Sequence, residues 1–335
     1  MSTPWIDAYR PKDFDQVAGN PKAVRALDNL VRRNASIPNL LLCGPPGCGK
    51  TTCINILCDR VIGNKNDSRI LRLSSFDGRG VDQVRTTVKN FARGRVRVEE
   101  GNPRIAKIVI LDEADSMTPD ALQAMRRVME ANSATTRFIL VCNESTKIIE
   151  PIQSRCAILR FSKVGDDSLY SRLVRVCGMA GVDLTPEGIR AVVRVAAGDA
   201  RVAVNELQKT VRCFGTVTEE NVYRLCDNPQ PRRIVELVAS LGSRDSLVSP
   251  ETTGEGFLGV VRSLRDMCDD GRAPSDIVST FLNVCAEMDV DEGTRVEILK
   301  AVGLAQTRVL SGVSTHLQLV AMCRNIALAF EGSTT

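Results

Sequence analysis

The stretch Leu40-Leu41-Leu42-Cys43-Gly44-Pro45-Pro46-Gly47-Cys48-Gly49-Lys50-Thr51-Thr52 decides the fold of this chain. Its apolar start predicts a buried β-strand, and Ile54, Leu57 and Ile62 follow at the spacing of a helix face. The turn between them has the pattern G-x-x-x-x-G-K-T, in which backbone N–H groups and the positive end of a helix surround a phosphate. The alternative is a glycine-rich turn that matches by chance, and the flanking strand and helix argue against it.

The side chains of this loop predict a site for ATP with Mg²⁺. Lys50 is expected to reach the β- and γ-phosphates, and the Thr51 hydroxyl is expected to ligate the metal ion. Glycine has no Cβ, so the backbone can approach the phosphates closely. The expected nucleotide-binding residues of the loop are Pro45, Pro46, Gly47, Cys48, Gly49, Lys50, Thr51 and Thr52.

The composition is that of a globular protein with two or three domains, because the chain has 335 residues, of which 43% are hydrophobic and 25% charged. A net charge of +4 is mild, so any affinity for nucleic acid must come from a local patch. The 12 cysteines form no C-x-x-C pair and the single histidine is His316, which argues against a zinc site. Disulfides are not expected in a chain of this size, so we expect the protein in the reducing cytosol or nucleus. No apolar run approaches the roughly 18 residues of a membrane span.

Strand and helix patterns alternate over residues 38–161, after a first helix predicted at 21–33. This alternation predicts a parallel sheet with helices on both faces. The predicted strands are the apolar run before the loop and residues 70–73, 105–111, 138–142 and 157–161.

From about residue 164 the pattern becomes helical. Thr118, Thr185 and Thr218 each precede a helical pattern and are predicted N-caps. A polar loop is predicted at 243–256, and the last helices are predicted near 274–288, 293–310 and 312–331.

Two carboxylates, Asp112 and Glu113, follow the apolar strand that ends at Leu111. Ligands of open α/β sheets bind at the carboxyl ends of the strands. Asp112 is therefore expected to hold Mg²⁺, directly or through water, and Glu113 to orient and polarise the attacking water. An acidic turn that caps a helix is the alternative reading.

Two further polar residues are candidates for the same site. Asn143 ends the next strand and could contact the γ-phosphate or position the water, or it could be an ordinary turn residue. Arg201 opens a helix, where a cation opposes the helix dipole, so it indicates an anionic partner. A surface arginine paired with Asp199 is the alternative.

A basic stripe between residues 79 and 97 is the candidate nucleic-acid contact. Arg85, Lys89 and Arg93 recur every four residues on a predicted helix, and Arg79 precedes it. Such a stripe can follow a phosphate backbone without reading its sequence. A solvated helix face is the alternative.

Taken together, these motifs resemble the AAA+ clamp-loader subunits of replication factor C over nearly the whole chain. The Ser-Arg-Cys element with its lead-in is the most specific of them. The matching segments, besides the phosphate loop, are Pro4-Trp5 with Tyr9-Arg10-Pro11-Lys12, Asp112-Glu113-Ala114-Asp115, Met125-Arg126-Arg127-Val128-Met129-Glu130, Thr135-Thr136-Arg137-Phe138, Cys142-Asn143, Ile149-Glu150-Pro151-Ile152-Gln153-Ser154-Arg155-Cys156, and Gly198-Asp199-Ala200-Arg201 with Asn205-Glu206-Leu207-Gln208.

The resemblance implies roles that the residues alone do not. Asn143 and Arg201 resemble the two sensor residues, and Arg155 resembles an arginine finger that acts on the ATP of a neighbouring subunit. The stripe that begins at Arg79 resembles the helix that tracks template DNA. The residues that match the adenine cradle of the family are Ile6, Tyr9, Arg10 and Ala18.

The resemblance also implies an α/β fold with three domains: a RecA-like AAA+ ATPase domain at 1–161, a helical lid at 162–228 and an all-helical collar at 229–335. The implied function is a nuclear ATPase in a hetero-pentamer that opens the PCNA sliding clamp and loads it onto primer–template DNA. Two alternatives are a scaffold subunit that binds ATP with little hydrolysis and, on the D-E-A-D tetrapeptide, a helicase or branch-migration motor. The motor reading would need a second RecA-like half, and the helical pattern offers none.

Two departures from the family pattern carry expectations of their own. Ser74-Ser75-Phe76-Asp77-Gly78-Arg79 differs from the usual family segment, which puts the finer DNA contacts there in doubt. Cys48 stands where the family usually has threonine. A thiol at a helix N-terminus has a lowered pKa, so Cys48 is expected to make the ATPase sensitive to alkylation.

Overall fold

The computed structural model describes residues 3–32, 37–62, 68–74, 81–94, 107–226, 229–242 and 253–332. The chain divides into two compact units, Met1–Val217 and Thr218–Thr335. The finer division into three domains, with boundaries after residues 161 and 228, stays a prediction. No described helix combines the length and the apolar character that crossing a membrane requires.

A parallel sheet of five strands forms the centre of the first unit, as the alternating pattern predicted. The strand order is β2-β3-β4-β1-β5, so β1 lies between β4 and β5, and β3 lies next to β4. Each strand starts or ends within a few residues of its predicted limits. The strands are β1 (Leu40–Cys43), β2 (Ile70–Ser74), β3 (Lys107–Asp112), β4 (Thr136–Cys142) and β5 (Ala157–Arg160).

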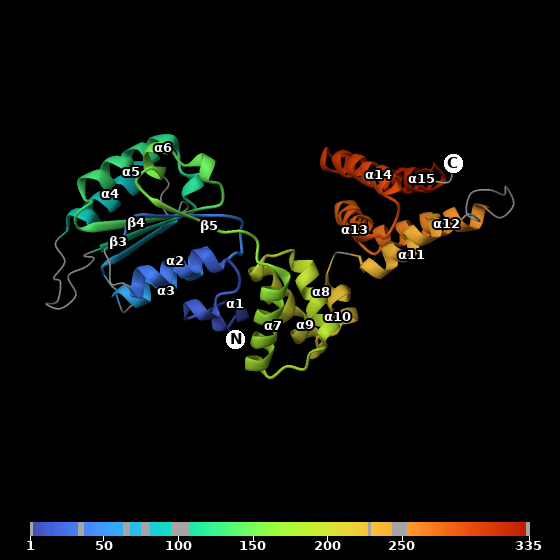
Figure 1. Cartoon of the computed structure of the whole chain (residues 1–335), viewed down its shortest axis with the longest axis horizontal. Helices are drawn as coiled ribbons and strands as arrows, with labels where there is room; N and C mark the ends of the chain where they lie inside the picture. The colour runs from blue at the N-terminus through green and yellow to red at the C-terminus, as the bar shows by residue number, and fades with distance from the viewer. Residues whose placement is uncertain are drawn as a thin grey trace. The chain divides into compact units, whose positions relative to one another are not determined.

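Helices cover both faces of this sheet (Figure 1). Successive residues of a strand point to opposite faces, so Leu40 and Leu42 pack with α2 and α3, while Leu41 packs with α4 and α5. All three leucines are fully buried. The unit begins with the short helix α1 (Trp5–Ala8). The covering helices and short turns are η1 (Phe14–Gln16), α2 (Pro21–Arg32), α3 (Lys50–Ile62), α4 (Val81–Arg93), η2 (Ala114–Ser116), α5 (Pro119–Ala131), η3 (Ser145–Lys147) and α6 (Glu150–Gln153).

Three helices after the sheet pack against one another, and we call them the lid helices: α7 (Asp166–Ala180), α8 (Pro186–Ala196) and α9 (Ala200–Phe214). The three predicted threonine caps are confirmed. The hydroxyl oxygens of Thr118, Thr185 and Thr218 accept hydrogen bonds from backbone N–H groups three residues later, at 3.3, 3.1 and 3.3 Å.

The second unit is all-helical, and its apolar core includes the fully buried Phe281, Leu264 and Leu319. The predicted loop at 243–256 lies mostly outside the described residues, and its end was wrong, because α12 begins at Thr253. Residues 254, 256 and 259 are glycines, but the helix forms and buries Leu264 and its neighbours in the core. The last helix begins at His316 rather than at 312. The helices are α10 (Glu219–Leu225), α11 (Pro231–Gly242), α12 (Thr253–Asp269), α13 (Pro274–Glu287), α14 (Glu292–Leu310) and α15 (His316–Gly332).

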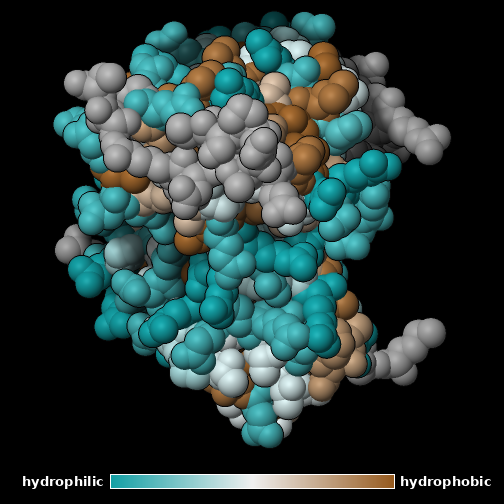
Figure 2. Space-filling view, turned by 90° about the vertical axis from the view of Figure 1, so that its right-hand side faces the viewer, coloured by the Kyte–Doolittle hydropathy of each residue, from teal (hydrophilic) through white to brown (hydrophobic). Residues whose placement is uncertain are grey.

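Some apolar side chains of α14 and α15 remain at the surface. Leu304, Leu310 and Leu317 expose 57%, 75% and 63% of their surface. Figure 2 shows hydrophobic residues that reach the molecular surface in separate areas, with hydrophilic residues between them.

The sheet core supplies a stability prediction. Phe138 lies on the central strand β4 and is fully buried. We expect Phe138→Ala to lower the free energy of unfolding of the first unit by about 3–5 kcal/mol, because the substitution leaves a cavity. Urea titration followed by the fluorescence of the single tryptophan, Trp5, measures this unit. The exposed Met179→Ala, in the same unit, is the control, and an equal loss in both variants would contradict the assignment of Phe138 to the core.

Candidate nucleotide-binding site

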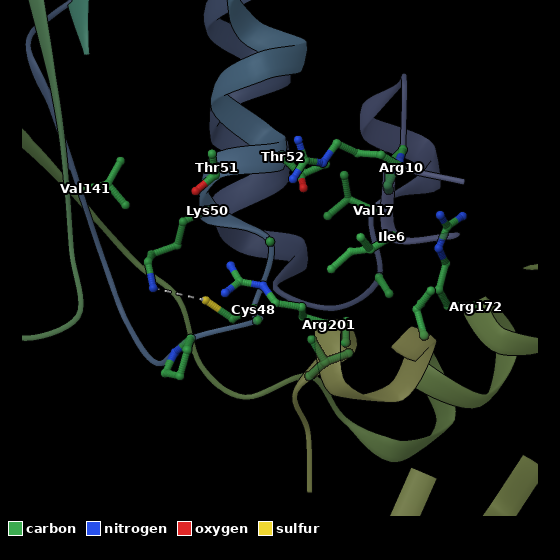
Figure 3. Close-up of a pocket in the computed structure, with 18 of the residues that line it drawn as sticks. Ile6, Arg10, Val17, Cys48, Lys50, Thr51, Thr52, Val141, Arg172 and Arg201 are labelled. Atoms are coloured by element: carbon green, nitrogen blue, oxygen red, sulfur yellow. Dashed lines mark hydrogen bonds between the residues drawn. The ribbon is translucent and has the colours of Figure 1, made fainter. Parts of the chain in front are cut away.

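A pocket lies at the carboxyl ends of β1, β3 and β4, between the glycine-rich loop, α1 and the lid helices (Figure 3). Strands that are neighbours in a parallel sheet end side by side, so the loop and the polar residues after β3 and β4 meet there. The sequence-predicted residues that line this pocket are Ile6, Tyr9, Arg10, Ala18, Pro46, Gly47, Cys48, Gly49, Lys50, Thr51, Thr52, Asp112, Glu113, Asn143 and Arg201. Pro45 does not line it but contributes its backbone carbonyl to the contacts of Lys50.

The backbone of the loop needs glycine at three positions. A Cβ on Gly44, which has φ +150°, would overlap the Phe161 carbonyl. Gly47 has φ +67° and Gly49 has φ +97°, conformations that other residues rarely adopt. A Cβ on Gly47 would also overlap the carboxylate of Asp199, at the start of α9. The loop and the lid therefore touch directly, and the Ala200 N–H donates to the Gly47 carbonyl at 3.2 Å.

Lys50 is buried, and its ammonium group faces into the loop. It donates to the Pro45 carbonyl at 2.8 Å and to Oδ1 of Asn143 at 3.1 Å, and it also contacts the Gly44 carbonyl. The contact with Asn143 favours a role in the site over an ordinary turn asparagine. Lysine and amide thus meet where the loop predicts the terminal phosphates.

The residues present fit a magnesium ion bound together with phosphates. Oγ1 of Thr51 lies 3.4 Å from Oδ2 of Asp112, so a hydroxyl and a carboxylate converge at one point. Mg²⁺ prefers oxygen ligands and is commonly held by one or two carboxylates plus substrate phosphates. Within the described ranges no three His, Cys, Asp or Glu side chains gather as a metal site.

Glu113 adopts a left-handed backbone conformation with φ +53°. Such a conformation is costly for a residue other than glycine, and it often occurs at functional sites. Glu113 stands at the N-cap of η2 but its side chain makes no capping hydrogen bond, which disfavours the helix-capping alternative. Asp115, on η2, accepts from the N–H groups of Asn143 and Glu144 at 3.1 and 3.4 Å. The turn after β3 is thereby tied to the end of β4.

Arg201 lies in the first turn of α9 and points toward the phosphate loop (Figure 3). The Asp199 carboxylate caps this helix, accepting from the N–H groups of Arg201 and Val202 at 2.7 and 3.2 Å. Among the described residues no ion pair joins Arg201 to Asp199. The exposed guanidinium is therefore available to an anion in the pocket.

Sequence reasoning missed several residues of the pocket, and Arg172 of α7 is the most important of them. Arg172 is 8% exposed and donates to the Tyr9 carbonyl. Burial lowers the pKa of its guanidinium, and the neighbouring Arg175 adds to this effect. A signal was present, because Arg172 falls on the apolar face of its helix beside Leu169 and Leu173. Trp5, Val17 and Val204 are apolar wall residues that the spacing rules could not identify.

Arg155 does not line the pocket of its own chain. Its side chain is 37% exposed, donates to the Pro151 carbonyl at 2.7 Å and pairs with Glu130 at 2.7 Å. Hydrogen bonding from Arg126, with the charge of Arg155 as a smaller cause, lowers the pKa of Glu130. An exposed ion pair of this kind is weak and easily exchanged.

The basic stripe lies only partly within the described residues. Arg79 is outside them, and for Arg85 only the backbone of α4 is described. Lys89 is half-buried and Arg93 exposed, whereas Val88 is buried against the sheet. The helix that would carry the stripe is therefore present, with an apolar face inward.

The expectation of a lowered pKa for the Cys48 thiol was wrong. Cys48 is 1% exposed, and its Sγ donates to the Pro45 carbonyl at 2.9 Å. Burial raises the pKa of the Cys48 thiol, and the nearby Lys50 ammonium offsets this only in part. Cys53 and Cys58 are buried behind it, and burial raises their pKa values to about 12 and about 11.

This burial predicts slow alkylation of Cys48. The thiolate is the reactive form, and a raised pKa lowers its fraction at pH 8. We expect iodoacetamide to modify Cys48 at least about tenfold more slowly than the exposed Cys213. Peptide mass spectrometry of the native chain measures both rates. Cys48→Thr should lose ATPase activity to the reagent as fast as the unaltered chain, and protection by this substitution would contradict the buried thiol.

Comparison with known proteins agrees with the motifs. The family described as "ATPase family associated with various cellular activities (AAA)" matches residues 40–164, and the "Replication factor C C-terminal domain" matches residues 248–325. Replication factor C subunit 4 of Oryza sativa subsp. japonica is 42% identical over 330 residues, 98% of this chain and 93% of the relative. Replication factor C subunit 2 of Arabidopsis thaliana is 40% identical over 328 residues, 98% of this chain and 94% of the relative.

A solved structure supports the fold alone. The Thermotoga maritima RuvB Holliday junction branch migration motor aligns with a TM-score of 0.53 and 16% identity, over 84% of this chain and 93% of RuvB. The resemblance drawn from the motifs is confirmed by the relatives with nearly full coverage. The chain therefore belongs to the replication factor C subunits, with an ATPase domain of the AAA family.

Proposed function

We propose that this chain is a small subunit of a clamp loader that uses ATP to open the PCNA sliding clamp and load it onto primer–template DNA in the nucleus. The observation that carries the proposal is the match to replication factor C subunits along 98% of the chain, together with a complete set of phosphate-site residues around one pocket. The name of these relatives supports an assembly with further subunits of the same family.

The contacts in the pocket support hydrolysis by positioning and electrostatics. Lys50 would neutralise charge on the terminal phosphates, and Thr51 with Asp112 would hold Mg²⁺. Glu113 would orient and polarise the attacking water, while Asn143 and Arg201 would contact the γ-phosphate from either side. The adenine would lie on the opposite wall, against Ile6, Tyr9, Arg10 and Ala18.

Two exposed groups of side chains support assembly, and the basic pattern of α4 supports DNA binding. Arg155 lies at the surface, in reach of a second subunit, and would complete the neighbour's site. The apolar side chains Leu304, Leu310 and Leu317 support the prediction that the last helices form a collar between subunits. The helix α4, with the predicted stripe Arg79, Arg85, Lys89 and Arg93, would follow the phosphates of DNA without base readout.

The branch-migration alternative receives no support beyond the fold. RuvB shares 16% identity with this chain, and the parallel sheet followed by helices is the whole of the similarity. The second RecA-like half that a DEAD-box reading requires is not among the described elements, which are helical after β5.

The first prediction from this proposal concerns the subunit's own site. We expect Lys50→Ala to abolish ATP binding and Glu113→Gln to retain it while hydrolysis falls by about 10²–10⁴-fold. Nucleotide titration and single-turnover hydrolysis in the assembled complex measure the two effects. Tight ATP binding by Lys50→Ala would overturn the site. If Glu113→Gln leaves hydrolysis and clamp loading unchanged, this subunit is an ATP-binding scaffold.

The second prediction concerns catalysis between subunits. We expect Arg155→Ala to leave ATP binding by its own chain unchanged and to lower hydrolysis at the adjacent subunit's site by about 10³-fold or more. Hydrolysis at the adjacent site is measured in complexes in which all other sites are inactivated. Each of those sites is inactivated by substitution of its phosphate-loop lysine. The exposed Arg127→Ala, on α5, is the control. A loss confined to the chain's own site would contradict action in trans.

A further inference from the structure

The short helix α1 is fastened to the lid helices at both of its ends. At its start, the Trp5 N–H donates to Oε1 of Gln208, on α9, at 3.0 Å. At its end, the guanidinium of Arg172, on α7, donates to the carbonyl of Tyr9. Both hydrogen bonds join a lid side chain to the backbone of the N-terminal segment. They therefore do not depend on which side chains the segment carries.

These two lid side chains are buried more deeply than polar groups usually are. Arg172 and Gln208 are each 8% exposed. A buried guanidinium loses its hydration, and a buried polar group keeps its place only with a hydrogen-bond partner. Among the described residues Arg172 has no ion pair, and the Tyr9 carbonyl is the partner that the structure gives it. The contact with α1 therefore compensates part of the cost of burying the side chain.

Helix α1 is also a wall of the nucleotide pocket. Trp5, Ile6 and Tyr9 line the pocket, and the Trp5 and Tyr9 rings meet edge to face with centroids 5.5 Å apart. Figure 3 shows Arg172 beside Ile6, on the opposite side of the pocket from Lys50. Side chains of α7 and α9 therefore help to set the place of this wall.

We propose that Arg172 and Gln208 are positioning residues for nucleotide binding, which fasten α1 to the lid so that the wall facing the base and the lid helices move as one body. Arg172 lines the pocket, whereas Gln208 does not. Gln208 can therefore influence a bound nucleotide through Trp5 but not by direct contact. A Gln208 variant thus distinguishes a positioning role from direct contact with the nucleotide. The proposal rests on nucleotide binding at this pocket and is independent of clamp loading.

The single tryptophan of the chain makes the fastening measurable in the full-length protein, because Trp5 itself is one of the fastened residues. We expect Gln208→Met and Arg172→Met each to increase quenching of Trp5 fluorescence by acrylamide. We expect each to weaken binding of Mg·ATP and of Mg·ADP by the same factor, about five- to tenfold, since the fastening acts on the base side and not on the γ-phosphate.

Matched controls lie on exposed positions. Arg190→Met removes an exposed cation from the lid helix α8, and Gln123→Met removes an exposed glutamine from α5. Both variants should leave quenching and affinity unchanged. Thermal unfolding shows whether each variant is folded. If Gln208→Met fails to fold, Gln208→Asn replaces it, since it keeps the amide but is one methylene too short to reach the Trp5 N–H.

Each outcome decides the proposal. Weaker binding and greater quenching in the Gln208 variant support the fastening. Unchanged affinity in that variant, with or without a loss in Arg172→Met, overturns it, because Arg172 would then act by direct contact alone. If the unaltered chain binds neither nucleotide, the assignment of the pocket to a nucleotide fails, and so does the proposed positioning role. Greater Trp5 quenching in the Gln208 variant would then show only that the contact between α1 and the lid exists.

Discussion

The pairing of β3 with β4 and of β4 with β1 is the constraint on which the site depends. In a parallel sheet these neighbouring strands end at one edge, so three segments far apart in sequence deliver their polar groups to the same place. The phosphate loop follows β1, Asp112 ends β3 and Asn143 follows β4. The bonds between Lys50 and Asn143 and between Thr51 and Asp112 are consequences of that order, not independent features.

The second dependence is the contact between the loop and the lid. Gly47 lies so close to Asp199 that no other side chain fits there, and the Gly47 carbonyl accepts from the Ala200 N–H. Asp199 at the same time caps α9 and orients its first turn, where Arg201 stands. One carboxylate thus sets both the approach of the lid and the direction of Arg201. The cost of a cation at a helix N-terminus is tolerable because the capping carboxylate lies beside it.

The sheet, and the gathering of Lys50, Asp112 and Asn143 at one pocket, could be predicted from the sequence because both depend on local patterns. An apolar strand followed by Asp112 and Glu113, or a threonine before a helical pattern, is visible in a few adjacent residues. The contacts of Arg172 and Gln208 could not be predicted, since their partners are backbone atoms of Tyr9 and Trp5, more than 160 residues away. The sequence shows only that Arg172 falls on the apolar face of its helix.

The errors have physical causes as well. Glycines at the start of α12 suggested a loop, but packing of Val260, Leu264 and Met267 outweighs a weak helix propensity. The thiol of Cys48 was expected to be acidic from its place at a helix N-terminus. The effect of burial on the pKa is larger, because the loss of water destabilises the thiolate more than the helix end and the Lys50 ammonium stabilise it. Helix position is readable from sequence, whereas depth of burial is a property of the whole fold.

The two walls of the pocket therefore belong to different parts of the first unit. The wall that carries Lys50 is built on the sheet through α3, β3 and β4, while the wall formed by α1 is bonded to α7 and α9. The Ala200 N–H already joins the lid to the loop at the Gly47 carbonyl, so a ligand that contacts both walls would bind across an existing contact. Arg155 follows α6 on the sheet side, donates to the Pro151 carbonyl and pairs with the exposed carboxylate of Glu130. Any ligand that contacts both walls therefore couples the lid helices to the part of the chain that carries Arg155.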